Sequence, residues 1–206
     1  MQEFSIYMSF EKTIEKDAVN ELPLKVFEGP IHLIDSIDQL NTVIPKLDSS
    51  SCLGFDTETR PSFKKGRNNK VSLLQLATPK ESFLFRINKI GLPSEIRKIL
   101  ADPKISKVGA AIHDDIKSLQ KIKSFEPQGF TDLQDLVKEY GIECLSLKKL
   151  AAVVLNIRIS KSQQLSNWEA DLLTRPQQKY AATDAWVSIE IFQKLLSSKN
   201  NSGKQK

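Results

Sequence analysis

Leu53-Gly54-Phe55-Asp56-Thr57-Glu58 is the stretch of sequence that decides how the chain is interpreted. It belongs to an apolar run that enters polar residues, which predicts a central β-strand over 52–59. Alternate side chains of a strand share a face, so Asp56 and Glu58 project together. Two adjacent carboxylates repel each other, and a divalent cation, which prefers oxygen ligands, relieves that repulsion. An exposed strand end with two solvated acids explains the pair equally well.

Around this strand, apolar periodicity predicts strands first and helices later. One or two short strands, broken by Gly29-Pro30, are expected over 26–34, and the other expected strands cover 71–78, 82–87 and 107–112. The expected helices cover 36–47, 93–101, 114–122, 132–140, 146–155 and 175–197. Ser36 and Thr174 begin two of these helices in the S/T-x-x-Q form of a capping box. This order, with one crossover, indicates an α/β layered fold on a mixed sheet.

The length of 206 residues suits one compact domain with short terminal appendages. We expect an N-terminal arm over 1–24, a folded domain over 25–196 and a disordered basic tail over 197–206. Apolar runs fall far short of the roughly 20 residues of a membrane helix, and a secretion signal is not recognisable. Cys52 and Cys144 lack CxxC spacing and are expected to be reduced thiols. These features predict a cytoplasmic protein without membrane contact.

A basic segment follows the first acidic pair. Residues 60–70 contain five basic side chains and no acid, which equals the whole net charge of +5. These basic residues are Arg60, Lys64, Lys65, Arg67 and Lys70. Such a cluster is most often a solvated loop, and a phosphate-binding role requires an active site beside it.

Two later patterns also contain candidate acids. Asp114 and Asp115 stand where a buried strand turns into a helix, a position where aspartates commonly serve only as caps. Tyr180 and Asp184 are four residues apart, so they share one face of a helix, and the small residues between them allow close packing. Taken alone, the second pair is better explained as a core tyrosine bonded to a nearby acid.

Read together, these acids form an ordered set that resembles the DEDD superfamily of 3′→5′ exonucleases. Asp56 and Glu58 come first, an aspartate at the strand–helix turn follows, and Asp184 comes last. Tyr180 matches the subclass that has a tyrosine four residues before the last aspartate. The subclass with histidine places it one residue earlier, where this chain has Lys179. The resemblance therefore excludes the histidine version.

Further spaced motifs extend this resemblance to the exonuclease domains of the Werner-syndrome helicase and ribonuclease D over about residues 25–196. They are Asp56-Thr57-Glu58-Thr59-Arg60-Pro61, Lys70-Val71-Ser72-Leu73-Leu74-Gln75-Leu76, Gln164-Leu165-Ser166-Asn167-Trp168, Leu173-Thr174 and Tyr180-Ala181-Ala182-Thr183-Asp184-Ala185. The match selects Asp115 over Asp114, because Leu119 then falls at an apolar position of the family. Thr59 departs from the family's usual aromatic, which puts base stacking there in doubt. The implied fold is ribonuclease H-like, with three layers and a mixed central sheet flanked by helices.

The resemblance also implies a mechanism with two divalent metal ions, about 3.5–4 Å apart. It assigns Asp56 to both ions, Glu58 and Asp184 to the first, and Asp115 to the second through water. Tyr180 would orient the attacking water, because a phenol with a pKa near 10 is a poor base at neutral pH. Mg²⁺ is the expected ion, Mn²⁺ should substitute for it, and the product is a nucleoside 5′-monophosphate.

The expected partner is the 3′ end of a nucleic acid, with DNA favoured over RNA. Beside such a site, the five basic residues of 60–70 become candidate phosphate contacts, and Lys161 is a sixth. The sequence predicts no protein partner and leaves the oligomeric state open. A catalytically silent nucleic-acid-binding module on the same fold is the alternative, and a purely structural domain is a third. The complete set of four acids and a tyrosine argues against both.

Overall fold

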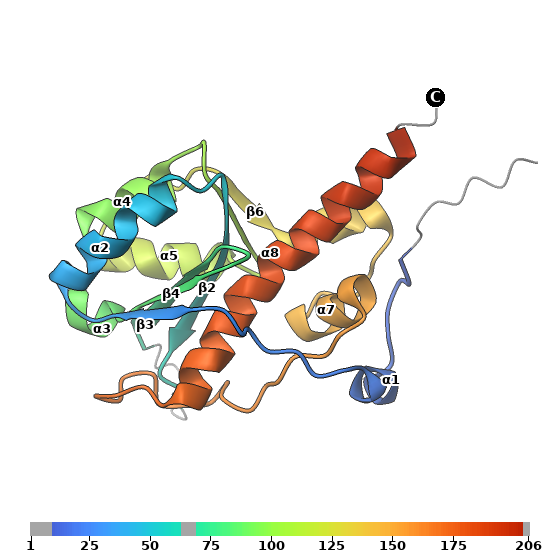
Figure 1. Ribbon diagram of the computed structural model, residues 1–206, viewed down its shortest axis with the longest axis horizontal. Coiled ribbons are helices and arrows are strands. Elements are labelled where there is room, and N and C mark those ends of the chain that lie inside the picture. Colours follow the sequence, from blue (N-terminus) through green and yellow to red (C-terminus); the bar gives the residue numbers. More distant parts are fainter. Residues whose placement is uncertain (1–9, 63–68, 204–206) are drawn as a thin grey trace, which may run out of the picture.

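The computed structural model describes residues 10–62 and 69–203 and is shown in Figure 1. Within these residues, a six-stranded mixed sheet has the order β1-β4-β3-β2-β5-β6. The strands are β1 (Ile31–Ile34), β2 (Cys52–Thr59), β3 (Val71–Ala77), β4 (Ser82–Phe85), β5 (Ser106–Gly109) and β6 (Phe130–Asp132). β2 pairs antiparallel with β3 and parallel with β5, so it lies inside the sheet. The predicted mixed sheet with a central strand over 52–59 is confirmed.

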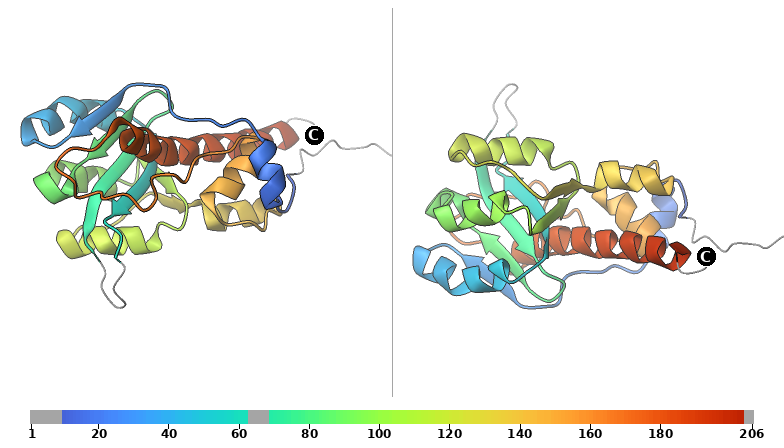
Figure 2. Two further views of the ribbon diagram at one scale, coloured as in Figure 1. Left: turned by 90° about the horizontal axis from the view of Figure 1, so that it is seen from below. Right: turned by 90° about the horizontal axis from the view of Figure 1, so that it is seen from above.

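Helices cover both faces of the sheet. They are α1 (Lys16–Glu21), α2 (Ile37–Asp48), α3 (Ile87–Ile90), α4 (Ser94–Ala101), α5 (His113–Ile122), α6 (Leu133–Leu136), the 3₁₀ helix η1 (Val137–Tyr140), α7 (Leu147–Leu155) and α8 (Arg175–Gly203). Figure 2 shows α8 on one side of the strands and α5 on the other, which makes three layers. None of the described helices combines the length and the apolar character that crossing a bilayer requires.

The face of β2 toward α8 is packed through small residues. A Cβ atom at Gly54 would overlap the main-chain carbonyl oxygen of Ala185, so only glycine permits this approach. On the helix, Ala181, Ala182 and Ala185 are fully buried. The close approach that the small residues predicted is confirmed, and it brings the helix backbone directly onto the strand.

The opposite face of β2 carries the larger apolar side chains. Leu53 and Phe55 are fully buried in one cluster with side chains of α2, α4 and α5. The ring of Phe55 also meets that of Phe130 edge-on, with 5.3 Å between their centroids. Burial of this apolar surface fixes which face of the strand turns inward, and therefore which face carries the acids.

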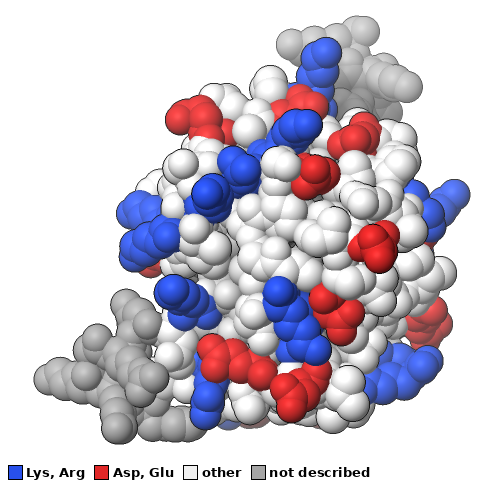
Figure 3. Space-filling view, turned by 90° about the vertical axis from the view of Figure 1, so that its left-hand side faces the viewer, with Lys and Arg blue, Asp and Glu red and all other residues white. Residues whose placement is uncertain are grey.

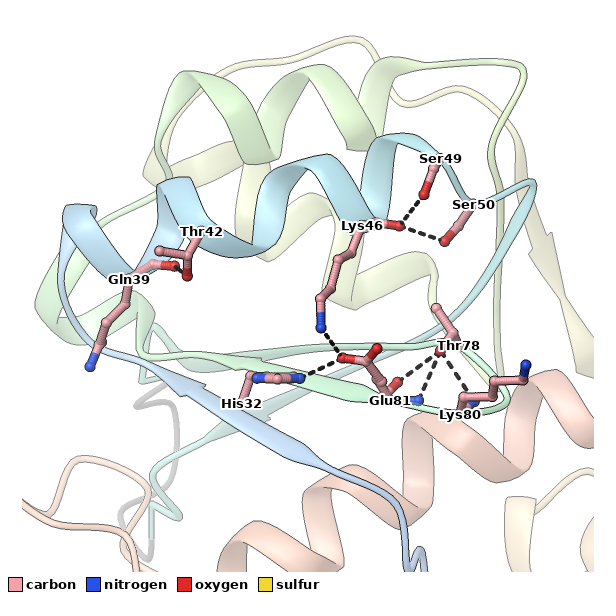
Figure 4. A network of polar contacts seen from close by, with 9 residues as sticks. All are labelled: His32, Gln39, Thr42, Lys46, Ser49, Ser50, Thr78, Lys80 and Glu81. Atoms are coloured by element: carbon pink, nitrogen blue, oxygen red, sulfur yellow. Dashed lines mark hydrogen bonds and ion pairs between the residues drawn. The ribbon is translucent and has the colours of Figure 1, made fainter.

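At the edge of the sheet, a polar network connects α2 with β1 and with the turn that precedes β4 (Figure 4). Glu81 Oε2 lies 2.5 Å from Lys46 Nζ and 2.6 Å from His32 Nε2. Hydrogen bonds from Lys46 and then from His32 hold the pKa of Glu81 below its usual value. The network is partly exposed, so it orients α2 on the sheet rather than supplying much of the stability.

Both predicted capping motifs are found, in part at the start of α2 and in full at the start of α8. The Gln39 amide donates to Ser36 Oγ at 3.4 Å, while Gln39 Oε1 accepts from the Asp35 amide at 2.9 Å. At α8 the reciprocal pair is complete, because Gln177 Oε1 accepts from the Thr174 amide at 2.9 Å and the Gln177 amide donates to Thr174 Oγ1 at 3.4 Å. Local sequence therefore sets where both helices begin.

Some predicted boundaries are wrong. Of the one or two short strands expected over 26–34, the one after Gly29-Pro30 is β1. The residues before that break form no strand of the sheet and pair instead with the segment after α7, where the Lys25 amide donates to the Arg158 carbonyl at 2.9 Å. β6 was not predicted, and the helix expected over 132–140 is divided into α6 and η1.

The tail expected to be disordered from residue 197 is also wrong up to Gly203, where α8 ends. Ser198 is only 9% exposed, and Lys199 Nζ lies 3.2 Å from Glu139 Oε2 of η1. Packing of this last part of the helix against the rest of the chain outweighs its polar composition. Residues 204–206 lie outside the described part.

We predict that Gly54→Ala lowers the free energy of unfolding by about 1–3 kcal/mol, the usual cost of overpacking. The added methyl group must displace α8, since β2 is held on both sides by neighbouring strands. Urea unfolding followed by circular dichroism measures the change. Adding Ala185→Gly should not restore stability, because the overlapping atom is a backbone oxygen; recovery in the double variant would contradict this explanation.

Candidate active site

Asp56 and Glu58 project from β2 on the face covered by α8. Both are partly buried, whereas the alternating neighbours Phe55 and Thr57 are buried on the other face. Asp56 Oδ1 accepts a hydrogen bond from the Thr57 amide at 2.8 Å, which orients the carboxylate. The predicted pairing of the two acids on one face is confirmed.

α8 places Asp184 and Tyr180 above these acids. Asp184 is 7% exposed, and the Tyr180 hydroxyl donates a hydrogen bond to its carboxylate. Carboxylate oxygens of Asp56, Glu58 and Asp184 all lie within 4.8 Å of one another. The close packing at Gly54 makes this possible, because it brings α8, which carries Asp184, onto the strand that carries the other two acids.

Asp115 reaches the same site from the first turn of α5. Its Oδ1 accepts a hydrogen bond from the Thr57 hydroxyl, which ties α5 to β2. Its neighbour Asp114 instead has a side chain 95% exposed, 3.9 Å from Lys117 Nζ. The geometry therefore places Asp115, and not Asp114, at the site, as the resemblance implied. Asp115 stands beside the cluster of three carboxylates rather than within it.

Asp132 fixes the turn that delivers Asp115, a feature that the sequence did not reveal. Its two carboxylate oxygens accept from the amides of Ala111 and Ile112, at 3.0 Å each. Ala111 has a φ of 60°, a conformation that L-residues rarely adopt and that these hydrogen bonds stabilise. The only local signal was an aspartate before a helix, which in isolation indicates a cap; it does cap α6, through the Gln134 amide at 2.8 Å.

The motif Ser166-Asn167-Trp168 packs against Tyr180 through its tryptophan. Trp168 is fully buried, and its ring lies 6.0 Å from that of Tyr180 between centroids. The segment after it is held by the buried Arg86, whose guanidinium donates to the carbonyls of Ala170 and Asp171. Arg86 was also missed from the sequence, because its partners are backbone atoms more than eighty positions away.

Burial and mutual repulsion make the site reluctant to ionise. Burial, then the charges of Asp184 and Asp115, hold the pKa of Asp56 well above its usual range. Burial, and to a smaller extent the negative charge of Asp56, raises the pKa of Glu58 to about 10. Burial raises the pKa of Asp184 to about 7, against the hydrogen bond from Tyr180 and the charge of Lys161. Burial likewise raises the pKa of Asp115 to about 6.

This donor set fits a divalent metal ion. Three carboxylates within 4.8 Å supply only hard oxygen ligands, which suit Mg²⁺ and Mn²⁺. Without a cation, their raised pKa values show that the charges are poorly compensated. A bound cation would favour the ionised forms, so metal binding and deprotonation are coupled here.

The acids open into a cleft of about 310 Å³. Lys161 lines this cleft, together with Tyr180, Glu58 and the polar residues Ser160 and Gln164. Among the predicted phosphate contacts that fall within the described residues, Lys161 is therefore the one that stands beside the acids.

Two of the other predicted contacts lie elsewhere. Arg60 and Lys70 line a separate groove, and Arg60 Nη1 lies 3.3 Å from Glu169 Oε2. Lys64, Lys65 and Arg67 fall outside the described residues.

We predict that the metal-free protein loses stability as the pH rises from about 5 to 8. An acid whose pKa is raised by folding binds its proton more tightly in the folded state, so rising pH removes stability above the unfolded pKa, near 4. Glu58→Gln removes one such group and should flatten this decline. Thermal melts in EDTA across this range measure it, with Asp114→Asn as the matched exposed control. Equal slopes in wild type and Glu58→Gln would contradict the assignment.

Comparisons with known proteins agree with this geometry. A family model described as 3′-5′ exonuclease matches residues 31–198. The bifunctional 3′-5′ exonuclease/ATP-dependent helicase WRN of Mus musculus is 31% identical over 90% of this chain and 14% of its own length. The chain spans less than half the length of the first curated relatives, 41%, 14% and 29%.

Solved structures show the same fold. The Nibbler EXO domain of Aedes aegypti superposes with a TM-score of 0.76 and 27% identity, covering 87% of this chain and 93% of that one. RNase D of Escherichia coli has a TM-score of 0.75 and 24% identity, over 87% and 47% of the two chains. The expected ribonuclease H-like architecture is confirmed. With the family model matching most of its length, this chain belongs to the 3′-5′ exonuclease family.

Proposed function

We propose that this chain is a metal-dependent 3′→5′ exonuclease that releases nucleoside 5′-monophosphates from nucleic-acid ends. The observation that carries the proposal is the convergence of Asp56, Glu58 and Asp184, whose carboxylate oxygens lie within 4.8 Å, beside Tyr180 in an open cleft. Such a cluster at the bottom of a cleft serves a polyanionic substrate only when a cation neutralises it.

Two divalent ions complete the proposed site. Asp56, Glu58 and Asp184 would hold the first, and Asp56 and Asp115 the second. When bound, such ions supply a nucleophilic water and neutralise the charge of the phosphodiester. We propose Mg²⁺ as the natural ion and Mn²⁺ as an effective substitute, because both accept carboxylate ligands.

The residues of the chain orient the reaction. Tyr180 remains protonated, because burial and the negative charges of Asp184 and Glu58 raise the pKa of its hydroxyl. It therefore acts by hydrogen bonding, holding Asp184 and the attacking water, and not as a base. Lys161 lines the same cleft and places a positive charge where a substrate phosphate would lie.

DNA is the proposed preferred polymer. Support comes from the resemblance of this chain's motifs to the exonuclease domain of the Werner-syndrome helicase, whereas the resemblance to ribonuclease D favours RNA. Thr59 stands where the family usually has an aromatic residue. The proposal therefore depends on the cleft and not on base stacking at the end of β2.

We predict metal-dependent shortening from the 3′ end of 5′-labelled 3′-recessed duplex DNA, with slower cleavage of single-stranded RNA. Time courses resolved on sequencing gels, with Mn²⁺, Mg²⁺ or EDTA, measure both polymers. Asp56→Ala should abolish the ladder. Asp115→Ala should lower the rate by at least about a hundredfold, a loss typical for a group that stabilises the transition state.

Asp114→Ala is the matched control and should retain wild-type activity, because its side chain is 95% exposed. Equal losses in Asp114→Ala and Asp115→Ala would show that only the helix start matters. Binding of both polymers without cleavage of either would replace the proposal with a catalytically silent nucleic-acid-binding module.

A second prediction separates orientation from base catalysis. Tyr180→Phe should lower kcat about a hundredfold, because it removes the hydroxyl that holds Asp184 and the water. The shape of the pH–rate profile between pH 6 and 9 should stay unchanged, since the phenol does not titrate there. Loss of one limb of the profile in this variant would instead identify Tyr180 as the base.

A further inference from the structure

A second cavity, distinct from the cleft, lies between the end of β2, the start of β3 and the C-terminal half of α5. It is a groove of about 490 Å³. Its described lining residues are Thr59, Arg60, Pro61, Ser62, Asn69, Lys70, Ser118, Lys121 and Ile122. These include three cations and no carboxylate. Its charge is therefore opposite to that of the cleft.

Two elements lead from the acids into this groove. Along β2, Arg60 follows Glu58 by two residues, or about 7 Å at the rise of a strand. Along α5, Lys121 follows Asp115 by six residues, or about 9 Å along the helix axis. Ser118 lies midway, and residues three apart are neighbours on a helix surface. The groove is thus a continuation of the acidic site, bounded by the same strand and helix.

Local contacts shape its mouth. The Asn69 side-chain amide donates to the Arg60 carbonyl at 2.7 Å, which holds the ends of the β2–β3 connection together. Arg60 is drawn toward Glu169, 3.3 Å away, whereas Lys70 and Lys121 are exposed cations. Lys70 comes from the residue before β3 and Lys121 from α5, so two different elements supply the cations.

Figure 3 views the end of the molecule at which α2, α3 and α4 lie. Lys, Arg, Asp and Glu side chains are interspersed over that face, with several Lys and Arg along one side. The positive charge of the groove is therefore a local feature and not part of a face of one sign.

We propose that this groove binds the sugar–phosphate backbone of the substrate strand upstream of the cleaved bond, with Lys121 of α5 as a phosphate contact. The inference rests on the proposed exonuclease function. Lys121 lies about 9 Å from Asp115 along the helix axis, so its contact would be upstream of the phosphate held at the acids. Phosphodiester is the shared chemistry of DNA and RNA, so the groove carries no preference between them.

The experiment measures equilibrium binding in EDTA, where no cleavage occurs, of fluorescent dT₁₀ and U₁₀ and of the dinucleotide dTdT. Lys121→Ala should weaken binding of both decamers three- to tenfold and leave dTdT unchanged. It should also reduce the slope of log Kd against log salt by about 0.7, the value for one phosphate contact on a single strand. Lys121→Arg should restore both.

The matched control is Lys98→Ala, which removes an exposed lysine of α4 that lines neither the acidic cleft nor the groove. An equal loss in that variant would mean that net charge alone matters and would overturn the groove. An unchanged salt slope in Lys121→Ala, or no decamer binding by wild type at 10–20 mM salt (about a 20–30 Å Debye length), would overturn it as well. If the wild type binds with the predicted salt slopes but cleaves neither polymer, the groove's role in binding would be supported and the exonuclease proposal would be contradicted.

Discussion

The contact of α8 with β2 at Gly54 is the constraint on which the acidic site depends. Because the strand has no side chain there, the backbone of the helix reaches the strand, and Asp184 meets Asp56 and Glu58 within 4.8 Å. A side chain at position 54 would separate the elements that carry the acids. The same contact places Tyr180 over the cleft, where Trp168 supports it from the apolar side.

The acids gathered in this way oppose folding. Their raised pKa values mean that, at neutral pH without metal, the folded state either binds protons that the unfolded chain would release or buries charges that the unfolded chain would expose to water. The surrounding structure must offset this, and it does so with apolar clusters that involve several strands of the sheet and with the hydrogen bond from Thr57 to Asp115. A site that is unfavourable when empty becomes favourable when a cation fills it, which links metal affinity to stability.

Much of this could be predicted from sequence because it is local. Alternation along β2, the i, i+4 spacing of Tyr180 and Asp184, and the two capping boxes each depend on neighbouring residues. Asp132 could not be found this way, since its role arises from the pairing of β6, a strand of three residues, with β5. Lys121 was missed for the same reason: only the packing of α5 beside the end of β2 brings it to the groove.

The spacing of charges on α5 keeps the two parts of the surface from neutralising each other. A lysine four residues after Asp115 would form an ion pair with it and compete with a metal ion. That position is Leu119, which is fully buried, and Lys117 lies beside Asp114 instead. The first cation of the groove on this helix comes only at Lys121, about 9 Å from Asp115. The carboxylate therefore remains available to a metal ion, while the lysine remains available to a phosphate.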